Sequence, residues 1–440
     1  MIHERLARRS VVTWLCVVGL CWCVAVAGER PKEAARPMNG KPQVKSKEVF
    51  LKAQGTRVTQ WASAFYTRGT GLDLVCNATT TKRSDTVDTW QRRFSPDNGR
   101  TWSAWDTVSF VTRTPKGVHR LYAKPGWADP KTGRLLTLVL EATLPTDNPM
   151  EGMKHWTLRY RVSTDGGKTD AVDEPVVQKG GDYTPQHPVD GVWVGKNSIM
   201  MGAAGMRPIR TRRGHILVPV QITPIGPDGK YYNPGGGYTY HDSAVLIGTW
   251  RDDLKIDWEL SQRVVADPKK STRGCLEATI IEAPDGRVLM VMRGSNDRRR
   301  KQPGRKWYSV SDDGGFHWSP IKPWTYADGT PFFSPSSCSQ LLKHTNGHIY
   351  WIGNISPRNT HANSPRYPLV IGRVDPTSLL LVNDSVATID TRQSGEGADL
   401  QLSNFLVRED RENHDIVVHV TRFFPRKGWH GDAYVLRIAP

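Results

Sequence analysis

The sequence lacks the residues and runs that define several large classes of protein. It has six cysteines in 440 residues, and three of them fall within the predicted export signal described below. The other three, Cys76, Cys275 and Cys338, permit at most one intramolecular disulfide and form no metal-binding cluster. No glycine-rich phosphate loop, zinc ligand set or Ser-His-Asp motif is apparent. We therefore expect no cofactor, no metal and no dependence on disulfides.

The chain also lacks an apolar run long enough to cross a membrane. Its longest apolar run, residues 11–24, follows a basic segment at residues 5–9 and precedes Ala25-Val26-Ala27. A basic segment, a short apolar stretch and a small-x-small sequence are together typical of a secretory signal peptide. We therefore expect residues 1–27 to be removed, and the protein to be secreted or periplasmic with no stable membrane span.

Acidic residues are in deficit. Asp and Glu number 43 against 60 Lys and Arg, which gives a formal charge of +17. An exported basic protein suits a polyanionic partner, although the charge is equally consistent with solubility alone. The cations form no arm of the kind that binds nucleic acid, so we expect a glycan or acidic polysaccharide as partner, no nucleic acid, and a monomer. Residues 28–46 are rich in Pro, Lys and Arg, which predicts a disordered linker.

Patterns of long helices are absent as well, and a repeat takes their place. A glycine followed by an apolar run recurs at near-equal spacing, and a sixth copy, starting at Asp415, lacks the glycine. The glycines of the other five copies are Gly71, Gly133, Gly214, Gly286 and Gly347. Glycine is favoured where a hairpin turn needs a positive φ. Six similar β units predict an all-β protein, a six-bladed β-propeller of four-stranded antiparallel sheets over residues 47–440.

A second repeat is independent of the first. It occurs at residues 95–102 (SPDNGRTW), 311–318 (SDDGGFHW) and 163–169 (STDGGKT), with a worn copy at 251–258 (RDDLKIDW). The Asp carboxylate can accept turn N–H groups, Gly can adopt the left-handed conformation, and Trp can cap the sheet edge. These residues therefore predict turns rather than catalysis.

The pattern S-x-D-x-G-x-x-W resembles the Asp-box, or BNR repeat, of the sialidase-like propellers, which include the exo-alpha-sialidases. The resemblance spans roughly residues 50–440. It implies a six-bladed propeller with its ligand site at one end of the central channel. Function has to be argued from that site, because one fold supports many activities.

The most informative segment for the site is the predicted hairpin of residues 274–294. Glu277 opens one strand and Arg293 ends the next, which should bring both side chains to one rim of the ring. By resemblance, Glu277 matches the carboxylate that polarises the nucleophile, Arg293 matches one arginine of the carboxylate-binding triad, and Arg366 matches the third. The alternative for Glu277 and Arg293 is an ordinary ion pair at the rim.

Two parts of the family pattern are missing. The first-blade arginine of the triad should stand at Gln60, and Arg57 is out of phase, since a slip by one residue turns a side chain to the opposite face. The nucleophilic tyrosine should open the last blade, where residues 397–405 contain none, and Tyr367 is too close to Arg366 to replace it. The resemblance therefore does not by itself imply strict sialidase activity.

Loop carboxylates are candidates for the acid and the base. Asp85, preferred over Asp88, precedes the first Asp-box strand and resembles the proton donor of the family. Asp399 could complete a carboxylate pair with Glu277 of the kind used in glycoside hydrolysis. Each of these aspartates could equally be a solvated loop residue.

Two polar loops add candidates for substrate binding. The loop of residues 353–361, which contains Asn354, could bind sugar hydroxyls or could be an ordinary connection. The glycine-rich segment 231–242 contains Tyr240 and His241, a phenol and a base that, with arginines neutralising a uronate, would suit β-elimination. Its tyrosines could instead stack on sugar rings without chemistry.

These features predict an exported, exo-acting glycoside hydrolase of the sialidase-like superfamily that acts on a terminal acidic sugar. Asp85 is expected to act as acid/base and Glu277 as activator or base. Arg293 and Arg366 are expected to bind the anionic group. The alternatives are a non-catalytic glycan-binding propeller and a polysaccharide lyase acting on an acidic glycan.

Overall fold

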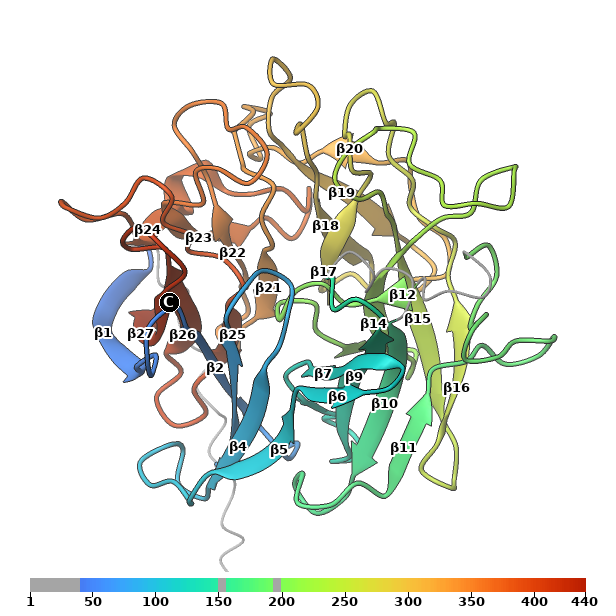
Figure 1. The fold of residues 1–440 in the computed structure, drawn as a ribbon. Helices are drawn as coiled ribbons and strands as arrows, with labels where there is room; N and C mark the ends of the chain where they lie inside the picture. Colours follow the sequence, from blue (N-terminus) through green and yellow to red (C-terminus); the bar gives the residue numbers. More distant parts are fainter. Residues whose placement is uncertain (1–39, 149–155, 193–198) are drawn as a thin grey trace, which may run out of the picture. The chain divides into compact units, whose positions relative to one another are not determined.

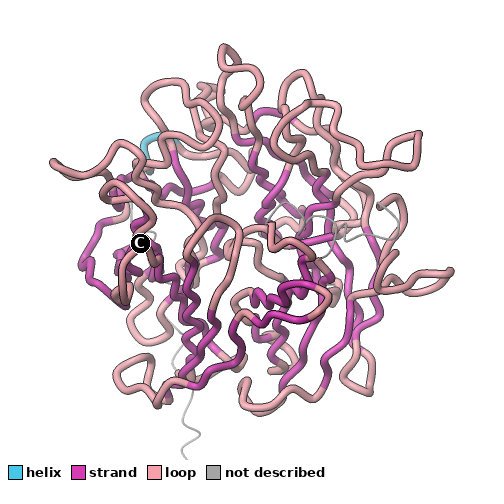
Figure 2. Tube along the Cα trace, in the orientation of Figure 1, coloured by secondary structure: helices cyan, strands magenta, loops and turns pink. Residues whose placement is uncertain are grey.

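The described part of the chain is built from strands and loops. A computed structural model describes residues 40–148, 156–192 and 199–440. They form 27 strands and one short 3₁₀ turn, Asn383–Ser385 (Figure 2). None of them belongs to a helix long and apolar enough to cross a membrane. The prediction of an all-β protein is therefore confirmed.

The strands form five sheets, of which the largest has eight strands. Its first half contains β2 (Thr59–Tyr66), β3 (Leu74–Thr81), β4 (Thr89–Ser95) and β5 (Asp106–Phe110). Its second half contains β25 (Leu406–Glu409), β26 (Ile416–Phe423), β27 (Gly431–Ala439) and the N-terminal strand β1 (Gln43–Leu51). In the described chain the strand pairing between the two halves is limited to one residue pair, Thr59 with Gly431.

The other four sheets follow one another along the chain. The second contains β6 (Thr112–Thr114), β7 (Gly117–Ala123), β8 (Trp127–Ala128), β9 (Leu135–Leu144), β10 (Thr157–Ser163) and β11 (Val172–Pro175). The third contains β12 (Ile199–Met200), β13 (Ile209–Arg210), β14 (Ile216–Ile222), β15 (Asp242–Trp250) and β16 (Ile256–Leu260). The fourth contains β17 (Leu276–Glu282), β18 (Val288–Arg293), β19 (Lys306–Ser311) and β20 (Lys322–Pro323). The fifth contains β21 (Gln340–Lys343), β22 (Ile349–Asn354), β23 (Leu369–Val374) and β24 (Ala387–Asp390).

Within residues 40–440 the sheets stand side by side around a common centre (Figure 1). Strands from successive parts of the ring contact one another there: β17 contacts β21, and β21 contacts β25, between neighbouring sheets. β25 contacts β2 between the two halves of the largest sheet. Apolar side chains fill the spaces between adjacent sheets, for example between β10 and β14 and between β15 and β17. Each Å² of apolar surface buried in this way contributes about 25 cal/mol. The three described cysteines are buried and unbridged, so packing rather than cross-linking holds the sheets together.

The glycine repeat marks equivalent strands. The six predicted apolar runs are β3, β9, β14, β18, β22 and β26, and each pairs with an inner strand of its sheet. The five glycines that precede these runs have φ between +69° and +93°. In the copy without glycine, His414 takes φ +60° instead. The predicted hairpin turns are therefore confirmed at all six positions, including the one where a histidine adopts the left-handed conformation.

The Asp-box residues form turns, as predicted. Ser311 Oγ donates to Asp313 Oδ1 at 2.8 Å, and the backbone N–H of Gly315 donates to Ser311 Oγ at 2.8 Å. The copies at 95–102 and 163–169 have the same bonds. These turns follow β4, β10 and β19, each of which comes after a strand of the glycine repeat. In an antiparallel sheet they therefore lie at the end opposite to the connection between those two strands.

Strand β1 begins earlier than we predicted. We expected disorder from residue 28 to residue 46, but Gln43 already pairs with the last strand of the chain. The polar side chains that suggested disorder are used at the sheet edge, where Lys45 Nζ lies 2.5 Å from Asp415 Oδ1. The rest of the predicted linker up to residue 39, and the predicted signal peptide, lie outside the described residues.

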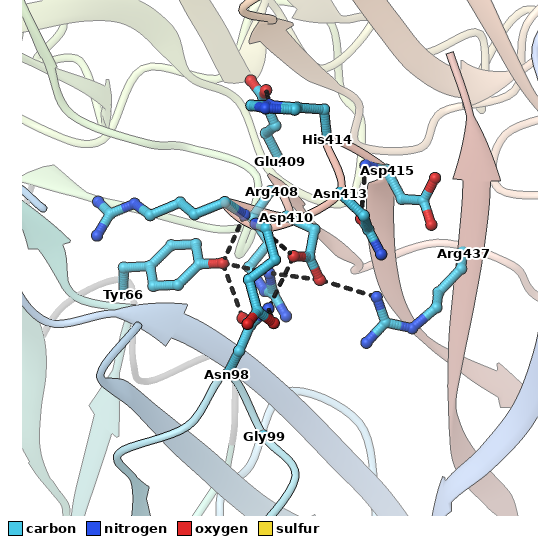
Figure 3. Close-up of polar contacts among 12 residues, drawn as sticks. Tyr66, Asn98, Gly99, Arg408, Glu409, Asp410, Asn413, His414, Asp415 and Arg437 are labelled. Carbon is cyan, nitrogen blue, oxygen red and sulfur yellow. Dashed lines mark hydrogen bonds and ion pairs between the residues drawn. The ribbon is translucent and has the colours of Figure 1, made fainter. Parts of the chain in front are cut away.

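A polar network ties the ends of the ring together (Figure 3). Tyr66, at the end of β2, donates its hydroxyl to Asn98 Oδ1 at 2.8 Å and accepts a bond from Arg408 at 3.2 Å. Asn98 Nδ2 donates to Asp410 at 2.7 Å, and Asp410 also accepts a bond from Arg437 at 2.8 Å. Asn98 belongs to an Asp-box turn. The network therefore supports the closure of the ring at the Asp-box end.

Candidate active site

Glu277 and Arg293 are in contact at the start of the fourth sheet. Leu276, the first residue of β17, pairs with Arg293, the last residue of β18, and the register is irregular between Leu276 and Thr279. Glu277 lies in this irregular stretch with φ +48°. Arg293 Nη1 donates to Glu277 Oε2 at 2.6 Å. The register of one hairpin is therefore enough to bring the two charged groups together.

The third sheet approaches Glu277 closely. A Cβ atom at Gly202 would lie only 2.8 Å from Glu277 Cγ, so any larger residue there would have to displace the carboxylate. The backbone N–H of Glu277 donates to Gln221 Oε1 at 3.2 Å. A glycine that leaves room and a glutamine that fixes the backbone together position Glu277.

Arg366 reaches the same place from the fifth sheet. Its Nη2 donates to the carbonyl oxygen of Ser336 at 2.8 Å, while Arg293 Nε donates to the Ser336 hydroxyl at 2.8 Å. Arg366 Nη1 also donates to Gln401 Oε1 at 2.8 Å and to Ser403 Oγ at 3.3 Å. Gln401 and Ser403 lie in the segment where the resemblance placed a tyrosine. In this chain, that segment orients a guanidinium group.

A third guanidinium comes from Arg273, four residues before Glu277. Its Nε donates to Thr239 Oγ1 at 3.2 Å, and it is almost fully buried. At the position where the resemblance expected an arginine, Gln60 donates its side-chain amide to two backbone oxygens, of Trp61 at 3.1 Å and of Thr79 at 3.2 Å. The first sheet therefore gives no guanidinium at Gln60, and Arg273 adds one from the segment that precedes β17.

The arginines keep the carboxylate ionised. Burial alone would raise the pKa of Glu277, but Arg293, Arg366 and Arg273 together lower it to about 2. Burial, with repulsion from Arg293, lowers the pKa of Arg366 and of Arg273 to about 10, and Glu277 opposes this shift. At neutral pH the site therefore holds one carboxylate anion and three guanidinium cations.

Two lysines are buried around the same carboxylate. Lys124 Nζ donates to the backbone oxygen of Gly202 at 3.3 Å, and Lys306 Nζ donates to the backbone oxygen of Ser337. Neither amine lies within ion-pair distance of a carboxylate in the described structure. Burial lowers the pKa of each lysine to about 7, and Glu277 opposes the shift in both.

Asp85 and Glu277 both act on the phenol of Tyr122. Burial raises the pKa of Tyr122, and the two carboxylates raise it further. Tyr122 lies near the end of β7, and Lys124 Nζ lies 3.7 Å from its ring centroid. Asp85 is exposed, with φ +56°, and accepts a bond from Ser84 Oγ at 2.8 Å. One predicted acid and the central carboxylate thus both act electrostatically on a phenol that the sequence did not point to.

Two of the predicted binding residues are bonded within the protein. Asn354 is fully buried, and its Nδ2 donates to the backbone oxygen of Arg366 at 3.1 Å, so it supports the arginine from behind. The Tyr240 hydroxyl donates to the backbone oxygen of Ala266 at 3.0 Å.

The other two predicted residues differ in exposure. His241 is buried, and burial, with repulsion from Arg273, lowers its pKa to about 3, so its imidazole is neutral at neutral pH. Asp399 is exposed, and within the described structure its carboxylate makes no hydrogen bond or ion pair. It stands two residues before Gln401, the partner of Arg366.

Four residues of the site were not predicted from the sequence, and only two of them could have been recognised from its local pattern. Lys306 pairs with Arg293 across β18 and β19, so the hairpin argument extended by one strand would have found it. Arg273 stands close to Glu277 in the sequence. Tyr122 and Lys124 belong to another sheet, and no local pattern distinguishes them from other residues of inner strands.

A small cavity lies beside the site at the centre of the ring. Its volume is about 60 Å³, and its lining includes Tyr122, Lys124, Asn404 and His419. Both ring nitrogens of His419 are buried and have no hydrogen-bond partner among the described residues. A cavity of this size has room for a few water molecules. Its lining is mixed, because the unpaired nitrogens of His419 lie among apolar side chains such as Leu406.

Comparison with solved structures shows which proteins share this fold. The chain is similar to a protein of unknown function from Dyadobacter fermentans, with 15% identity, 90% of this chain and 99% of that chain covered, and a TM-score of 0.58. It is similar to the NanB sialidase from Streptococcus pneumoniae, with 13% identity, coverage of 91% and 71%, and a TM-score of 0.53. It is also similar to the alpha-L-arabinanase of Penicillium chrysogenum complexed with arabinobiose, with 14% identity, coverage of 90% and 98%, and a TM-score of 0.53.

These likenesses show the fold, that of sialidase-like β-propellers, and at such low identity they show nothing further. A comparison with curated proteins gives no match. The family model described as a BNR repeat-like domain matches residues 73–385, which include the three clear Asp-box turns, Glu277, Arg293 and Arg366. The chain belongs to the family of BNR repeat-like domain proteins.

Proposed function

We propose that this protein is an exported, exo-acting glycoside hydrolase that removes a terminal acidic sugar from a glycan. Its scaffold is a six-bladed propeller in which the two halves of the eight-stranded sheet count as separate blades. Six equivalent strands after the repeat turns, and a single residue pair between the halves, support this count. The sialidase and arabinanase with the same fold act on glycans according to their names, which supports a carbohydrate substrate.

The observation that carries the proposal is the charge around Glu277. One carboxylate is surrounded by three buried guanidinium groups and by two buried lysines, and the low pKa of Glu277 is the consequence of this surplus of positive charge. Buried cations of this kind repel one another unless an anion joins them. Guanidinium groups bind carboxylates and similar oxyanions through paired N–H bonds. A sugar that carries an anionic group would therefore complete the site.

Glu277 cannot serve as the proton donor, because its pKa of about 2 leaves it ionised at neutral pH. An anionic substrate paired with the arginines would raise that pKa and let Glu277 act as a base. In the proposed reaction Glu277 takes the proton of the Tyr122 phenol as the phenolic oxygen attacks the anomeric carbon. Asp85 gives its proton to the departing glycosidic oxygen. In the second step Asp85 takes a proton from water, which attacks the anomeric carbon, and Tyr122 leaves and recovers its proton from Glu277.

The test is Glu277→Gln, which keeps the shape of the side chain and removes its basicity. We expect turnover of an acidic-sugar glycoside to fall by roughly 10³-fold or more, with binding of the same compound retained. Glu259→Gln is the matched control, because Glu259 is an exposed glutamate on β16. Full turnover by Glu277→Gln would contradict the proposal. Saturable binding by the wild type without any product would support the non-catalytic glycan-binding propeller instead.

The polysaccharide lyase is the weaker alternative. It needs a base and a phenol presented to the substrate. Tyr240 spends its hydroxyl on the backbone of Ala266, and His241 is buried. Release of a product with the ultraviolet absorbance of a new double bond would favour the lyase over the hydrolase.

A further inference from the structure

Three loops beside the site are bonded into one surface. They are residues 233–241 of the connection between β14 and β15, the segment 267–275 before β17, and the connection 294–305 between β18 and β19. Gly237 N donates to Thr272 O at 3.3 Å, and Thr272 N donates to Ser295 O at 2.9 Å. The three loops lie at the end of the sheets where β18 ends in Arg293. They therefore form a continuous wall of the site.

This wall carries a cluster of exposed cations that we call the basic rim. It consists of Lys269, Lys270, Arg298, Arg299, Arg300 and Lys301. All six side chains are exposed, and within the described structure none lies within ion-pair distance of a carboxylate. Two bonds place the cluster: Gln302 Nε2 donates to the backbone oxygen of Lys269, and Arg298 Nε donates to the backbone oxygen of Gly236 at 2.7 Å.

The carboxylate nearest to the basic rim in sequence is already used. Asp297 Oδ1 accepts a bond from Thr272 Oγ1, and its Oδ2 accepts a bond from the backbone N–H of Tyr238 at 3.1 Å. Asp297 thus holds two loops together. The charge of the rim remains available to a partner, and six adjacent cations attract a partner that has several negative charges.

Tyr238 lies between the basic rim and the buried arginines. Its side chain is 52% exposed, and the Arg273 guanidinium lies over its ring at 5.6 Å from the centroid. Asp85, the proposed proton donor, acts on both Tyr238 and Arg273. A phenol held by its backbone and half open to solvent is a surface on which a sugar ring can stack. The contact with Arg273 puts this ring at the edge of the site. The electrostatic action of Asp85 on the same ring assigns that edge to the leaving group.

We propose that Tyr238 and the basic rim bind the leaving-group side of a polyanionic glycan, a chain whose sugars carry carboxylate or sulfate groups at intervals. This inference rests on the proposed function and narrows it. The terminal acidic sugar occupies the site of Glu277, Arg293 and Arg366, the next sugar stacks on Tyr238, and the charged groups farther along the chain meet the rim. An isolated acidic sugar on a neutral glycan would leave the rim without a partner.

The test measures how the wild-type protein, a rim variant and a control variant bind several glycans. The rim variant is Arg299→Gln, Arg300→Gln and Lys301→Gln together, which leaves the bond from Arg298 intact. The control is Lys131→Gln, Lys168→Gln and Lys322→Gln, three exposed lysines outside the three loops whose removal changes the net charge equally. Binding is measured by fluorescence anisotropy at several NaCl concentrations. The labelled probes are an oligogalacturonate hexamer, a heparin hexasaccharide, neutral maltohexaose, and a single-stranded DNA of equal charge.

We expect one of the two anionic glycans to bind the wild type most tightly, with the sulfated and carboxylated probes distinguishing the two anion types. The rim variant should weaken this binding by roughly tenfold and reduce its salt dependence, since each exposed ion contact contributes little singly. The control should bind as the wild type does. Equal weakening by the two variants, equal binding of maltohexaose, or preference for the DNA would each overturn the inference.

Turnover separates this inference from the proposed function. If the wild type hydrolyses a small acidic-sugar glycoside and the rim variant does so equally well, the site is intact. The rim is then tested by kcat/KM on the hexamer alone, which should fall by roughly tenfold. Tyr238→Ala should lower kcat/KM on the hexamer but not on a glycosyl fluoride, whose leaving group is too small to stack. Tyr232→Ala, an exposed tyrosine of the same connection, should change neither, and an equal effect would contradict the role of Tyr238.

Discussion

Arg293 and Arg366 are both hydrogen-bonded to Ser336, one to its side chain and the other to its backbone. Arg293 binds the Ser336 hydroxyl and Arg366 binds the Ser336 carbonyl oxygen, each at 2.8 Å, although the two arginines come from different sheets. Two like charges are brought close by a shared neutral partner. The energetic cost of that proximity is offset by Glu277 in the free protein, and the proposed anionic substrate would offset it further.

The guanidinium group of Arg293 is expected to determine the pH below which activity is lost on acidification. Arg293→Lys loses the bonds to Ser336 and Asn363 and weakens the one to Glu277. Since Arg293 holds the pKa of Glu277 low, the variant should raise that pKa, and the loss of activity on acidification should begin at a higher pH. The measurement is the pH profile of kcat/KM. An unchanged acid limb with a uniformly lower rate would show that Arg293 only binds substrate.

The buried lysines predict a pH dependence of anion binding. Because the pKa values of Lys124 and Lys306 are lowered to about 7, both amines lose charge as the pH rises through neutrality. The affinity for an anionic ligand should therefore fall between pH 6 and pH 8, with proton uptake on binding near pH 7. Calorimetry in buffers of different ionisation enthalpy measures that uptake. Lys306→Met should bind more weakly and show a smaller dependence on pH, whereas equal slopes in the variant and the wild type would contradict a role for Lys306.

The phenol of Tyr122 is expected to be essential. Tyr122→Phe keeps the ring beneath Lys124 and removes the hydroxyl, so turnover should fall by roughly 10³-fold or more if the oxygen attacks the sugar. Tyr238→Phe is the matched control, because it removes a hydroxyl at the rim while keeping the stacking face, and its rate should stay within about threefold of the wild type. A small loss in Tyr122→Phe would mean that Glu277 activates water directly.

The edge of the largest sheet, where β1 pairs with β27, is expected to depend on a buried charge for its stability. Asp390 accepts a bond from Arg422 and pairs with Lys47, and both Asp390 and Arg422 are buried. Asp390→Ala leaves Arg422 with Glu396 as its remaining carboxylate partner and should lower the free energy of unfolding by about 1–3 kcal/mol. Lys47→Ala removes the more exposed partner and should cost about 0–1 kcal/mol. Urea unfolding measures both, and equal losses would show that the pair, rather than the buried arginine, determines stability.

Local patterns were sufficient to predict the strands, the turns and one edge of the site. Positive φ at a hairpin turn and alternation along a strand depend on neighbouring residues, so the repeat positions and the Glu277–Arg293 contact could be predicted from the sequence. Tyr122 and Arg366 meet that pair only because separate sheets close around one centre, and no local pattern encodes this meeting. Strand β1 was partly missed for a related reason, since its polar residues pair with a strand almost 400 positions away.

Product analysis of the wild type tests the central claim most directly. The protein is incubated with an acidic oligosaccharide, and the released sugars are measured by mass spectrometry and ultraviolet absorbance. The account predicts a saturated acidic monosaccharide released from one chain end, with one water added for each bond broken. Unsaturated products, internal cleavage, or unchanged substrate bound to the protein would contradict it.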